Sequence, residues 1–203
     1  MTQEYYSWDL KSNNFNRFGT VANAFTDLEL EEIIRAGEAE RVSAAAIVSA
    51  SDNVINPTYR STSITWIPSS KEKNGWLFRK LTDYVVNVNK QLFEFDLRTI
   101  ENLQYSIYNE GDFYKEHDDI IDTASTMRKL SFSLQLVDQS EYDGGDLLLK
   151  VRLDTEAAET LVSKSRVKGT LIFFPSFTTH EVSKVTRGTR KALVGWVTGP
   201  KFK

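Results

Sequence analysis

The feature that constrains the fold most is a change in the period of the apolar residues near residue 98. Before this point, apolar residues recur at spacings of three and four over residues 26–40 and 72–92, which predicts two helices. After it, the chain is a series of short runs rich in branched and aromatic residues, which predicts strands. Helices followed by many short strands indicate an α+β fold that is mainly β, with a sandwich or barrel in the second half.

The run 129–137 shows the strand pattern clearly, because its residues alternate in character. Leucines and one phenylalanine occupy the even positions from 130 to 136, and the odd positions hold Ser131, Ser133 and Gln135. Successive side chains of a strand point to opposite faces. We therefore expect an apolar face in the core and a polar row on an inner face.

Capping and turn signals separate the predicted elements. Thr26, followed by Glu29 three residues later, predicts a capping box at the start of the first helix. A further strand is predicted over 62–67, and turns at 109–111, 143–145, 169 and 187–188 divide the later strands. The length of 203 residues predicts a single domain, 1–203, in which 1–97 is a helical support region and 98–200 is the strand core.

The composition limits the chemistry that the chain can perform. It contains no cysteine, which excludes disulfides, thiolate metal sites and a cysteine nucleophile. It contains two histidines, so an imidazole-based metal site must use His117, His180 or both. The sequence patterns of serine hydrolases, phosphate-binding loops, dinucleotide-binding folds and zinc proteases are absent.

Charge and hydropathy narrow the possible partners. The formal net charge of -3 argues against a nucleic-acid binder. No apolar run approaches the length of a membrane span, and the first ten residues lack the features of a signal peptide. We therefore expect a soluble, cytoplasmic protein. Nothing in the sequence predicts the oligomeric state.

The segment 108–119 and the distant residue His180 carry the strongest chemical signal. If the segment is extended, His117 and Asp119 point to the same face and Asp118 points away. Two imidazoles and one carboxylate form a facial ligand set that suits Fe(II), because it leaves positions open for substrate and oxygen. A His-x-Asp triplet is common by chance, so the residues alone leave this interpretation open.

At this segment the sequence resembles the Fe(II)/2-oxoglutarate-dependent oxygenases, specifically the prolyl 4-hydroxylase-like and PKHD-type branch. The resemblance runs from about residue 60 to residue 200. It is carried, in order, by Tyr108-x-x-Gly111-x-x-Tyr114-x-x-His117-x-Asp119, Arg128-Lys-Leu-Ser131, Gly144-Gly145-Asp146, Gly169, Phe174-Pro175-Ser176, His180, Gly188-Thr-Arg190 and Val194-Gly195-Trp196. Each motif is weak alone, but their order and spacing together are specific.

The resemblance implies the fold, the metal and the reaction. The fold would be a double-stranded β-helix, or jelly roll, with the N-terminal helices packed on one sheet. His117, Asp119 and His180 would bind Fe(II), and no further catalytic residue is predicted. 2-Oxoglutarate and O2 would be consumed, with ascorbate as an accessory reductant. The C–H bond of a prolyl residue in a protein or peptide would be hydroxylated with release of succinate and CO2.

The resemblance also implies roles for residues around the metal. Arg190 would bind the distal carboxylate of 2-oxoglutarate, with Tyr108 as a second contact, while Tyr114 and Trp196 would line the substrate pocket. A guanidinium suits a carboxylate because it donates two parallel hydrogen bonds. Its competitors are Arg187, expected in a turn, and Lys191, whose side chain should point to the opposite face of the strand. For both, an exposed surface charge is the simpler interpretation.

Two departures from the family pattern leave the substrate open. Gly-Gly-Asp146 replaces the more usual Gly-Gly-Glu, and Leu147 follows where a small polar residue is common. One alternative is an oxygenase of the same fold that acts on a small molecule, another side chain or a modified base. A second is a metal-dependent jelly-roll enzyme without 2-oxoglutarate, which would not need Arg190. The third is a non-catalytic jelly-roll binding module.

Overall fold

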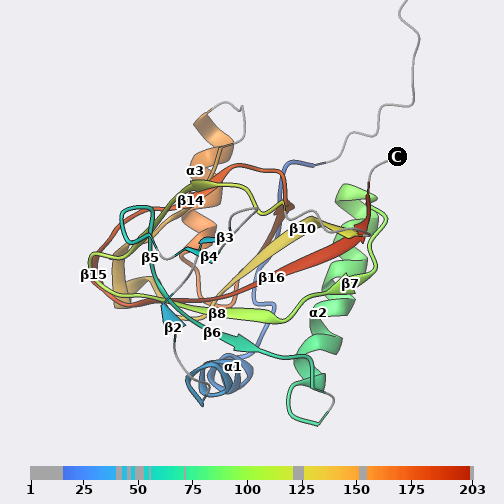
Figure 1. The fold of residues 1–203 in the computed structure, drawn as a ribbon, viewed down its shortest axis with the longest axis horizontal. Coiled ribbons are helices and arrows are strands. Elements are labelled where there is room, and N and C mark those ends of the chain that lie inside the picture. Colours follow the sequence, from blue (N-terminus) through green and yellow to red (C-terminus); the bar gives the residue numbers. More distant parts are fainter. Residues whose placement is uncertain are drawn as a thin grey trace, which may run out of the picture.

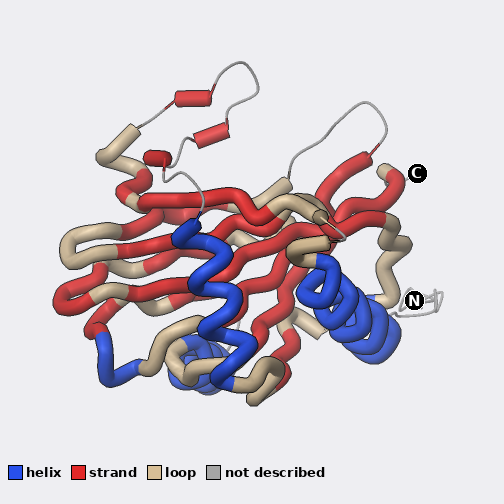
Figure 2. The backbone as a smooth tube through the Cα atoms, turned by 90° about the horizontal axis from the view of Figure 1, so that it is seen from below, coloured by secondary structure: helices blue, strands red, loops and turns tan. Residues whose placement is uncertain are grey.

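In the part of the chain that the structure describes, two β-sheets pack against each other and three α-helices lie at their periphery (Figures 1 and 2). This is a computed structural model, and it describes residues 16–39, 43–44, 47–48, 53–54, 56–70, 72–120, 126–150 and 155–201. The arrangement is the predicted double-stranded β-helix.

The larger sheet has the strand order β1-β13-β10-β16-β8-β6-β2, and β7 pairs with β16. Its strands are β1 (Gly19–Val21), β13 (Leu171–Pro175), β10 (Thr126–Gln135), β16 (Arg190–Pro200), β8 (Leu103–Tyr108), β6 (Ser63–Ile67), β2 (Ser43–Ala44) and β7 (Thr99–Ile100). The smaller sheet has the order β12-β14-β9-β5. Its strands are β12 (Leu147–Leu149), β14 (His180–Val182), β9 (Phe113–His117) and β5 (Arg60–Ser61).

Two short strand pairs complete the β-structure. They are β11 (Tyr142–Gly144) with β15 (Val185–Gly188), and β3 (Ile47–Val48) with β4 (Asn53–Val54). The helices are α1 (Asp27–Ala39), α2 (Gly75–Val88) and α3 (Thr155–Ser165). A π-helical turn at Asn89–Phe93 extends α2, and a 3-10 turn at Gln139–Glu141 precedes β11.

Both predicted helices are present, and the capping box at the first is confirmed. The Thr26 N–H donates to Glu29 Oε2 at 2.7 Å, and the Glu29 N–H donates to Thr26 Oγ1 at 3.3 Å. Helix α3 was not predicted. Among the α3 side chains that the structure describes, Leu161 is the buried apolar one, so the sequence lacks a visible apolar stripe there.

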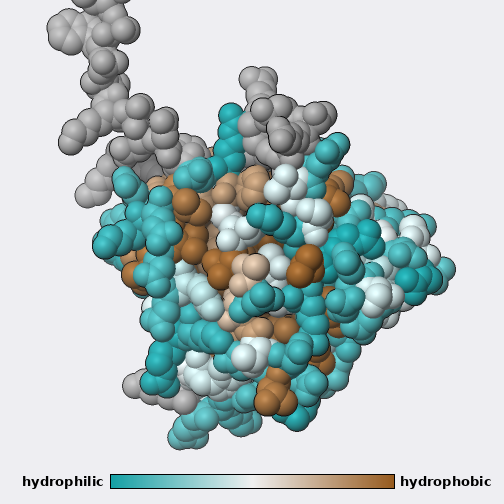
Figure 3. Space-filling model, turned by 180° about the vertical axis from the view of Figure 1, so that it is seen from behind, coloured by the Kyte–Doolittle hydropathy of each residue, from teal (hydrophilic) through white to brown (hydrophobic). Residues whose placement is uncertain are grey.

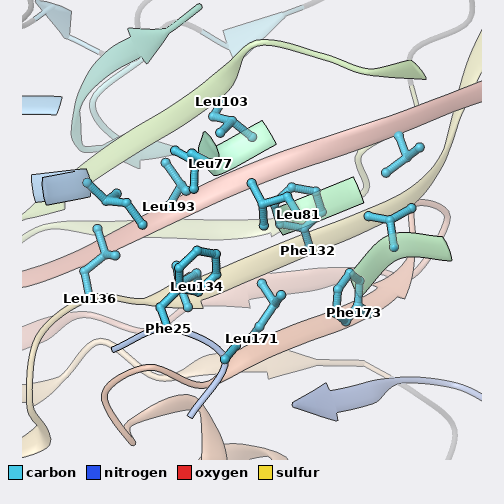
Figure 4. Packing of buried hydrophobic residues seen from close by; sticks show 14 of the residues in the cluster. Phe25, Leu77, Leu81, Leu103, Phe132, Leu134, Leu136, Leu171, Phe173 and Leu193 are labelled. Atoms are coloured by element: carbon cyan, nitrogen blue, oxygen red, sulfur yellow. The ribbon is translucent and has the colours of Figure 1, made fainter. Parts of the chain in front are cut away.

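The main core lies between the larger sheet and helices α1 and α2. Figure 4 shows Leu77 and Leu81 of α2 close to Phe132, Phe173 and Leu193 of the sheet. A second apolar cluster joins the two sheets and includes Ile172 and Phe174 of β13 with Leu147 and Val182 of the smaller sheet. The larger sheet is thus covered on both faces, by helices on one and by the second sheet on the other.

Helix α1 approaches the sheet at a glycine. A Cβ at Gly37 would lie 2.3 Å from the ring of Tyr105, which shows that the ring fills the space where a side chain would be. The Thr65 hydroxyl of β6 donates to the Gly37 carbonyl at 2.8 Å. Glycine therefore permits this contact because it lacks a Cβ.

The predicted division at residue 97 does not match the strand pairing. The region before it contributes β1, which pairs with β13, β6, which pairs with β8, and β5, which pairs with β9. Two predicted turns also lie in strands, because β11 and β15 contain 143–144 and 187–188. The register of this pair shifts between Asp143 and Gly144, where a Cβ on Gly144 would lie 2.1 Å from the Lys184 carbonyl oxygen. The glycine accommodates an irregularity in the ladder rather than a free turn.

On the face shown in Figure 3, apolar residues gather in the middle and hydrophilic ones form the rim. Trp66, Ile120 and Phe177 are among the large apolar residues that are exposed in the described part of the chain.

None of the helices found within the described ranges combines the length and the apolar character that a membrane crossing requires.

Candidate active site

The two histidines are neighbours across an antiparallel strand pair. His117 ends β9, His180 begins β14, and the register of the smaller sheet places the two directly opposite each other. Their ring centroids are 4.1 Å apart. Directly opposed residues of an antiparallel pair project to the same face, so residues 63 positions apart in the sequence present their imidazoles together.

Both imidazoles are oriented by the same local hydrogen bond. Nδ1 of His117 lies 2.7 Å from the carbonyl oxygen of Lys115, and Nδ1 of His180 lies 2.9 Å from that of Thr178. Because a carbonyl only accepts, each Nδ1 carries the proton and each Nε2 has a free lone pair. These Nε2 atoms lie 4.0 Å and 3.5 Å from the carboxylate oxygens of Asp119.

Asp119 lies beyond the end of β9 and is held by the segment after β13. Its backbone N–H donates to the Ser176 carbonyl at 2.9 Å. Its Oδ2 accepts a hydrogen bond from the Ser131 hydroxyl at 2.8 Å, and the Ser131 and Ser176 hydroxyls are 3.0 Å apart. The carboxylate is therefore buried and fixed. Asp118 is exposed, and its carboxylate accepts the Ile120 N–H at 3.0 Å.

Burial keeps His117 neutral. Burial, together with the neighbouring His180, lowers the pKa of His117 to about 4. The ring of Tyr114 stacks on His117 with centroids 3.5 Å apart, and burial raises the pKa of the Tyr114 phenol to about 12. At neutral pH the site thus contains a neutral imidazole and a neutral phenol, and the contacts with Asp119 are not ion pairs for His117.

These three residues fit a divalent transition metal. Their ligand atoms lie within 4.8 Å of one another, and the set of two imidazoles and one carboxylate is the one that suits Fe(II). The hydrogen bonds at each Nδ1 and at Oδ2 are the outer contacts that fix metal ligands in orientation. The structure therefore brings together the three residues that the sequence proposed as ligands.

The ligand set lines a cavity of about 340 Å³. Both sheets contribute residues to its wall. Its volume is sufficient for a small cosubstrate and a substrate side chain. All four further residues proposed from the sequence also line it, and these are Arg190, Tyr108, Tyr114 and Trp196.

Arg190 lies at the start of β16, directly opposite Tyr108 of β8, and its guanidinium lies 5.3 Å from the centroid of the Tyr108 ring. Only 3% of Arg190 is exposed, and its Nε has no hydrogen-bond partner. The two competitors are engaged elsewhere: Lys191 Nζ lies 2.7 Å from Glu38, and Arg187 Nε lies 2.6 Å from Asp143. Arg190 is therefore the one of these three cations that faces the cavity.

A polar set behind Arg190 holds it in place. Tyr142 is fully buried, and its hydroxyl accepts from Gln135 Nε2 at 3.0 Å and interacts with Arg190. Asp146 lies beside the same guanidinium, 3.6 Å from Arg166, and burial raises the pKa of its carboxyl above the usual range. This carboxyl is the Asp that departs from the family pattern, and it forms its ion pair with Arg166.

Three polar residues of the cavity wall were given no role at the level of sequence, namely Arg60, Gln104 and Arg128. A signal existed for Gln104, which shares a strand face with Tyr108 because their positions differ by an even number. Arg60 lies in the two-residue strand β5, where no alternation can be recognised. Arg128 could not be found in this way, since the register of β10 shifts between Arg128 and Leu130.

Comparison with known proteins relates part of the chain to a family. Residues 103–198, nearly half of the chain, match the family model of the 2OG-Fe(II) oxygenase superfamily. The resemblance stated from the motifs is therefore confirmed for the part of the chain that carries the proposed ligands.

The curated relatives are PKHD-type hydroxylases. One from Picosynechococcus sp. is 36% identical over 100 residues, which are 49% of this chain and 43% of that protein. One from Parvibaculum lavamentivorans is 33% identical over 122 residues, which are 57% of this chain and 53% of that protein. The chain thus spans about half the length of the curated relatives it matches.

Solved structures agree on the fold. A prolyl-4-hydroxylase from Pseudomonas putida superposes with a TM-score of 0.65 at 22% identity and covers 91% of this chain and 94% of its own. A prolyl hydroxylase from Trichoplax adhaerens, solved with a peptide fragment of a hypoxia inducible factor, has a TM-score of 0.69 at 19% identity. It covers 91% of this chain and 84% of its own. At these identities the likeness shows the fold.

Proposed function

We propose that this chain is an Fe(II)- and 2-oxoglutarate-dependent dioxygenase that hydroxylates a C–H bond. The observation that carries the proposal is the convergence of His117, Asp119 and His180 on one cavity that also contains Arg190, a buried arginine that forms no ion pair among the described residues. A metal site alone would not need this arginine, and a binding module would need neither.

His117, Asp119 and His180 would hold the iron. The protonated Nδ1 of each histidine donates to a backbone carbonyl, so each Nε2 offers its lone pair without a change of tautomer. The Ser131 hydroxyl donates to Oδ2 of Asp119 and leaves Oδ1 available. When bound, the iron with its cosubstrate supplies the oxidation of the C–H bond by O2, a step that amino-acid side chains cannot perform.

Arg190 would bind the distal carboxylate of 2-oxoglutarate, with the Tyr108 hydroxyl as a second contact. Burial of the guanidinium strengthens a charge-assisted hydrogen bond, because water does not compete there. The contact with the Tyr142 side chain limits the rotation of Arg190. Because burial lowers the pKa of His117 to about 4, no proton competes with the metal for its Nε2 at neutral pH.

The overall reaction consumes one O2 and one 2-oxoglutarate for each hydroxylated carbon, and releases succinate and CO2. No side chain in the cavity needs to act as a general acid or base. The protein contributes position and exclusion of water. Ascorbate as an accessory reductant stays a prediction.

A prolyl residue of a peptide or protein is the proposed substrate. PKHD-type hydroxylases and prolyl hydroxylases are the relatives in sequence and in fold, and one of these structures contains a peptide. Tyr114, Trp196 and Trp66 offer ring surface at the cavity, against which the pyrrolidine ring of proline can pack. The ring centroids of Trp66 and Trp196 are 6.1 Å apart, and the guanidinium of Arg128 lies 3.9 Å from the centroid of the Trp196 ring.

The test is formation of succinate from 2-oxoglutarate by the iron-loaded chain. We expect turnover by the wild-type chain and by Lys191→Ala, and loss of at least about 100-fold in turnover at low 2-oxoglutarate in Arg190→Ala, because a buried charge-assisted contact is removed. Lys191 is a matched control, since it is adjacent in sequence and its side chain pairs with Glu38 instead.

Absence of turnover in the wild-type chain with iron bound would contradict the proposal and favour a binding module. Turnover that is equal in Arg190→Ala would contradict the role of Arg190. A proline-containing peptide library, read by mass spectrometry for a gain of one oxygen, then tests the substrate.

A further inference from the structure

Three arginines line the cavity, and they differ in how their charge is balanced. Arg128 forms two hydrogen bonds with the Glu101 carboxylate, at 2.9 and 2.6 Å. Arg190 has a proposed partner in the distal carboxylate of 2-oxoglutarate. For Arg60, no ion pair is formed with any carboxylate in the portion of the chain that the structure describes.

Arg60 is nevertheless buried and ordered. It is 7% exposed, it lies in β5 opposite Tyr114 of β9, and its guanidinium lies 4.3 Å from the centroid of the Tyr114 ring. Its Nε is buried without a hydrogen-bond partner. A guanidinium does not lose its proton in a protein, so this charge persists whatever the surroundings.

A buried charge without a partner is costly to hold, and it is retained where a ligand completes it. The stack on Tyr114 fixes the plane of the guanidinium and leaves its edge for donation. The donor fork of an arginine matches a carboxylate, which accepts two parallel hydrogen bonds. Asp118, the other carboxylate at the cavity besides Asp119, is exposed and forms no ion pair with Arg60.

Counting charges on the basis of the proposed function leaves Arg60 alone. The two charges of Fe(II) are matched by the Asp119 carboxylate and by one carboxylate of 2-oxoglutarate, and the other carboxylate is matched by Arg190. Arg128 is matched by Glu101, and Arg166 lies beside Asp146. Arg60 and the exposed Asp118 remain at the cavity, and they form no ion pair with each other. The buried charge of Arg60 is therefore left for the molecule still to bind, which is the substrate.

We propose that Arg60 is an anion subsite for the substrate, so that the molecule hydroxylated is an acidic peptide whose carboxylate binds Arg60. Arg60, Tyr114 and His117 form a continuous stack, which places the subsite close to the metal ligands. The Arg60 guanidinium lies 4.3 Å from the Tyr114 ring centroid, which lies 3.5 Å from the His117 ring centroid, and an extended peptide covers such a span in about two residues. The carboxylate is therefore the side chain of an Asp or Glu within about two residues of the reacting one, or the C-terminal carboxylate of the peptide.

The first test measures binding of acetate, with no turnover required. The chain is loaded with Zn(II) and 2-oxoglutarate, and the Nε–H signals of its arginines are followed by NMR as acetate is added, with the Arg60 signal assigned from its absence in Arg60→Lys. We expect a saturable shift of the Arg60 signal and none of the Arg128 signal, which Glu101 already engages. No shift at Arg60, or a shift seen only without 2-oxoglutarate, would overturn the proposal.

The second test uses seven-residue alanine peptides with one central proline. In one series, a single Gln or a single Glu is placed at each position within two residues of the proline, and the Glu peptide is compared with the Gln peptide. In the other series, a peptide with a C-terminal acid is compared with the same peptide as its amide. The two series separate the two sources of the carboxylate. We expect one acidic peptide to bind the Zn(II)- and 2-oxoglutarate-loaded chain roughly 30-fold more tightly than its neutral partner. We expect Arg60→Gln to abolish this difference.

Arg79→Gln is the matched control, because Arg79 is an exposed arginine of α2 and its loss changes the net charge equally. The proposal would be overturned if acidic and neutral peptides bound the wild-type chain equally well. It would also be overturned if Arg79→Gln reduced the affinity difference between them as much as Arg60→Gln does. If no peptide binds while acetate still shifts the Arg60 signal, the peptide substrate is contradicted and the anion subsite is supported.

Discussion

The two faces of strand β10 are equally buried and entirely different in what they contact. Phe132 and Ser131 are adjacent, and both are 0% exposed. Phe132 packs in the apolar core with Phe173, whose ring centroid is 5.8 Å away, whereas Ser131 donates to a proposed metal ligand, Asp119. One strand thus supplies stability on one face and chemistry on the other, and a buried hydroxyl is tolerated where its hydrogen bonds are made.

The comparison extends to the partner strand β16. Gly195 lies opposite Phe132, and a Cβ there would lie 2.2 Å from the Phe132 ring. Trp196, the next residue, lies opposite Ser131 and lines the cavity. Substitutions on the helix-facing side should therefore change the free energy of unfolding, and substitutions on the inner side should change ligand affinity.

The largest effect is expected on the helix-facing side. Phe132→Ala removes a fully buried ring from the main core, and we expect the free energy of unfolding to fall by about 3–5 kcal/mol because both burial and packing are lost. Denaturant unfolding followed by circular dichroism measures this value. A loss below about 1 kcal/mol would show that the ring does not hold the sheet and the helices together.

The next effect concerns the inner side of the smaller sheet and appears as a pH dependence. His117 has a pKa of about 4 in the folded chain, below the ordinary value of 6.5. Below pH 6.5 the unfolded chain binds the proton more readily, so the metal-free chain should lose stability as the pH falls from 6.5 to about 4, by about 3 kcal/mol. Unfolding curves of the wild-type chain and of His117→Gln test this. If the free energy of unfolding falls equally with pH in both chains, the pH dependence arises from other groups.

A smaller effect is expected for the polar row of β10. Ser131→Ala removes the hydrogen bond to Asp119, and we expect metal affinity to fall about 10- to 100-fold while the free energy of unfolding changes little. Ser133→Ala is the matched control, because Ser133 also lines the cavity and no hydrogen bond joins it to Asp119. Calorimetric titration with Mn(II) provides the affinities. Equal losses in the two variants would show that Ser131 does not support the ligand.

Much of this architecture could be predicted because it rests on local pattern. The alternation in 129–137 predicted which side of β10 faces the core, and the capping box predicted where α1 begins. The ligand residues could be proposed since His117 and Asp119 are close in sequence and His180 is the only other histidine. Their meeting depends on the strand register, for which the sequence offers the family resemblance and no local signal.

What could not be predicted depends on contacts between distant segments. Arg128 and Leu130 have the same parity and should share a face, but the irregularity between them moves Arg128 to the cavity. Arg60 lies in a two-residue strand after a turn, and its burial follows from pairing with β9. Helix α3 could not be predicted for a different reason: its sequence contains too few large apolar residues to show a helical repeat.

The central claim is that the inner side of the two sheets forms an iron site that also takes 2-oxoglutarate, and the direct test compares two adjacent carboxylates. Iron-loaded protein is titrated with 2-oxoglutarate without oxygen, and the visible charge-transfer absorption of the iron–cosubstrate chelate is recorded for the wild-type chain, Asp118→Ala and Asp119→Ala. We predict the absorption in the wild-type chain and in Asp118→Ala and its loss in Asp119→Ala. Absorption that survives in Asp119→Ala, or that is absent from the wild-type chain, would contradict the account.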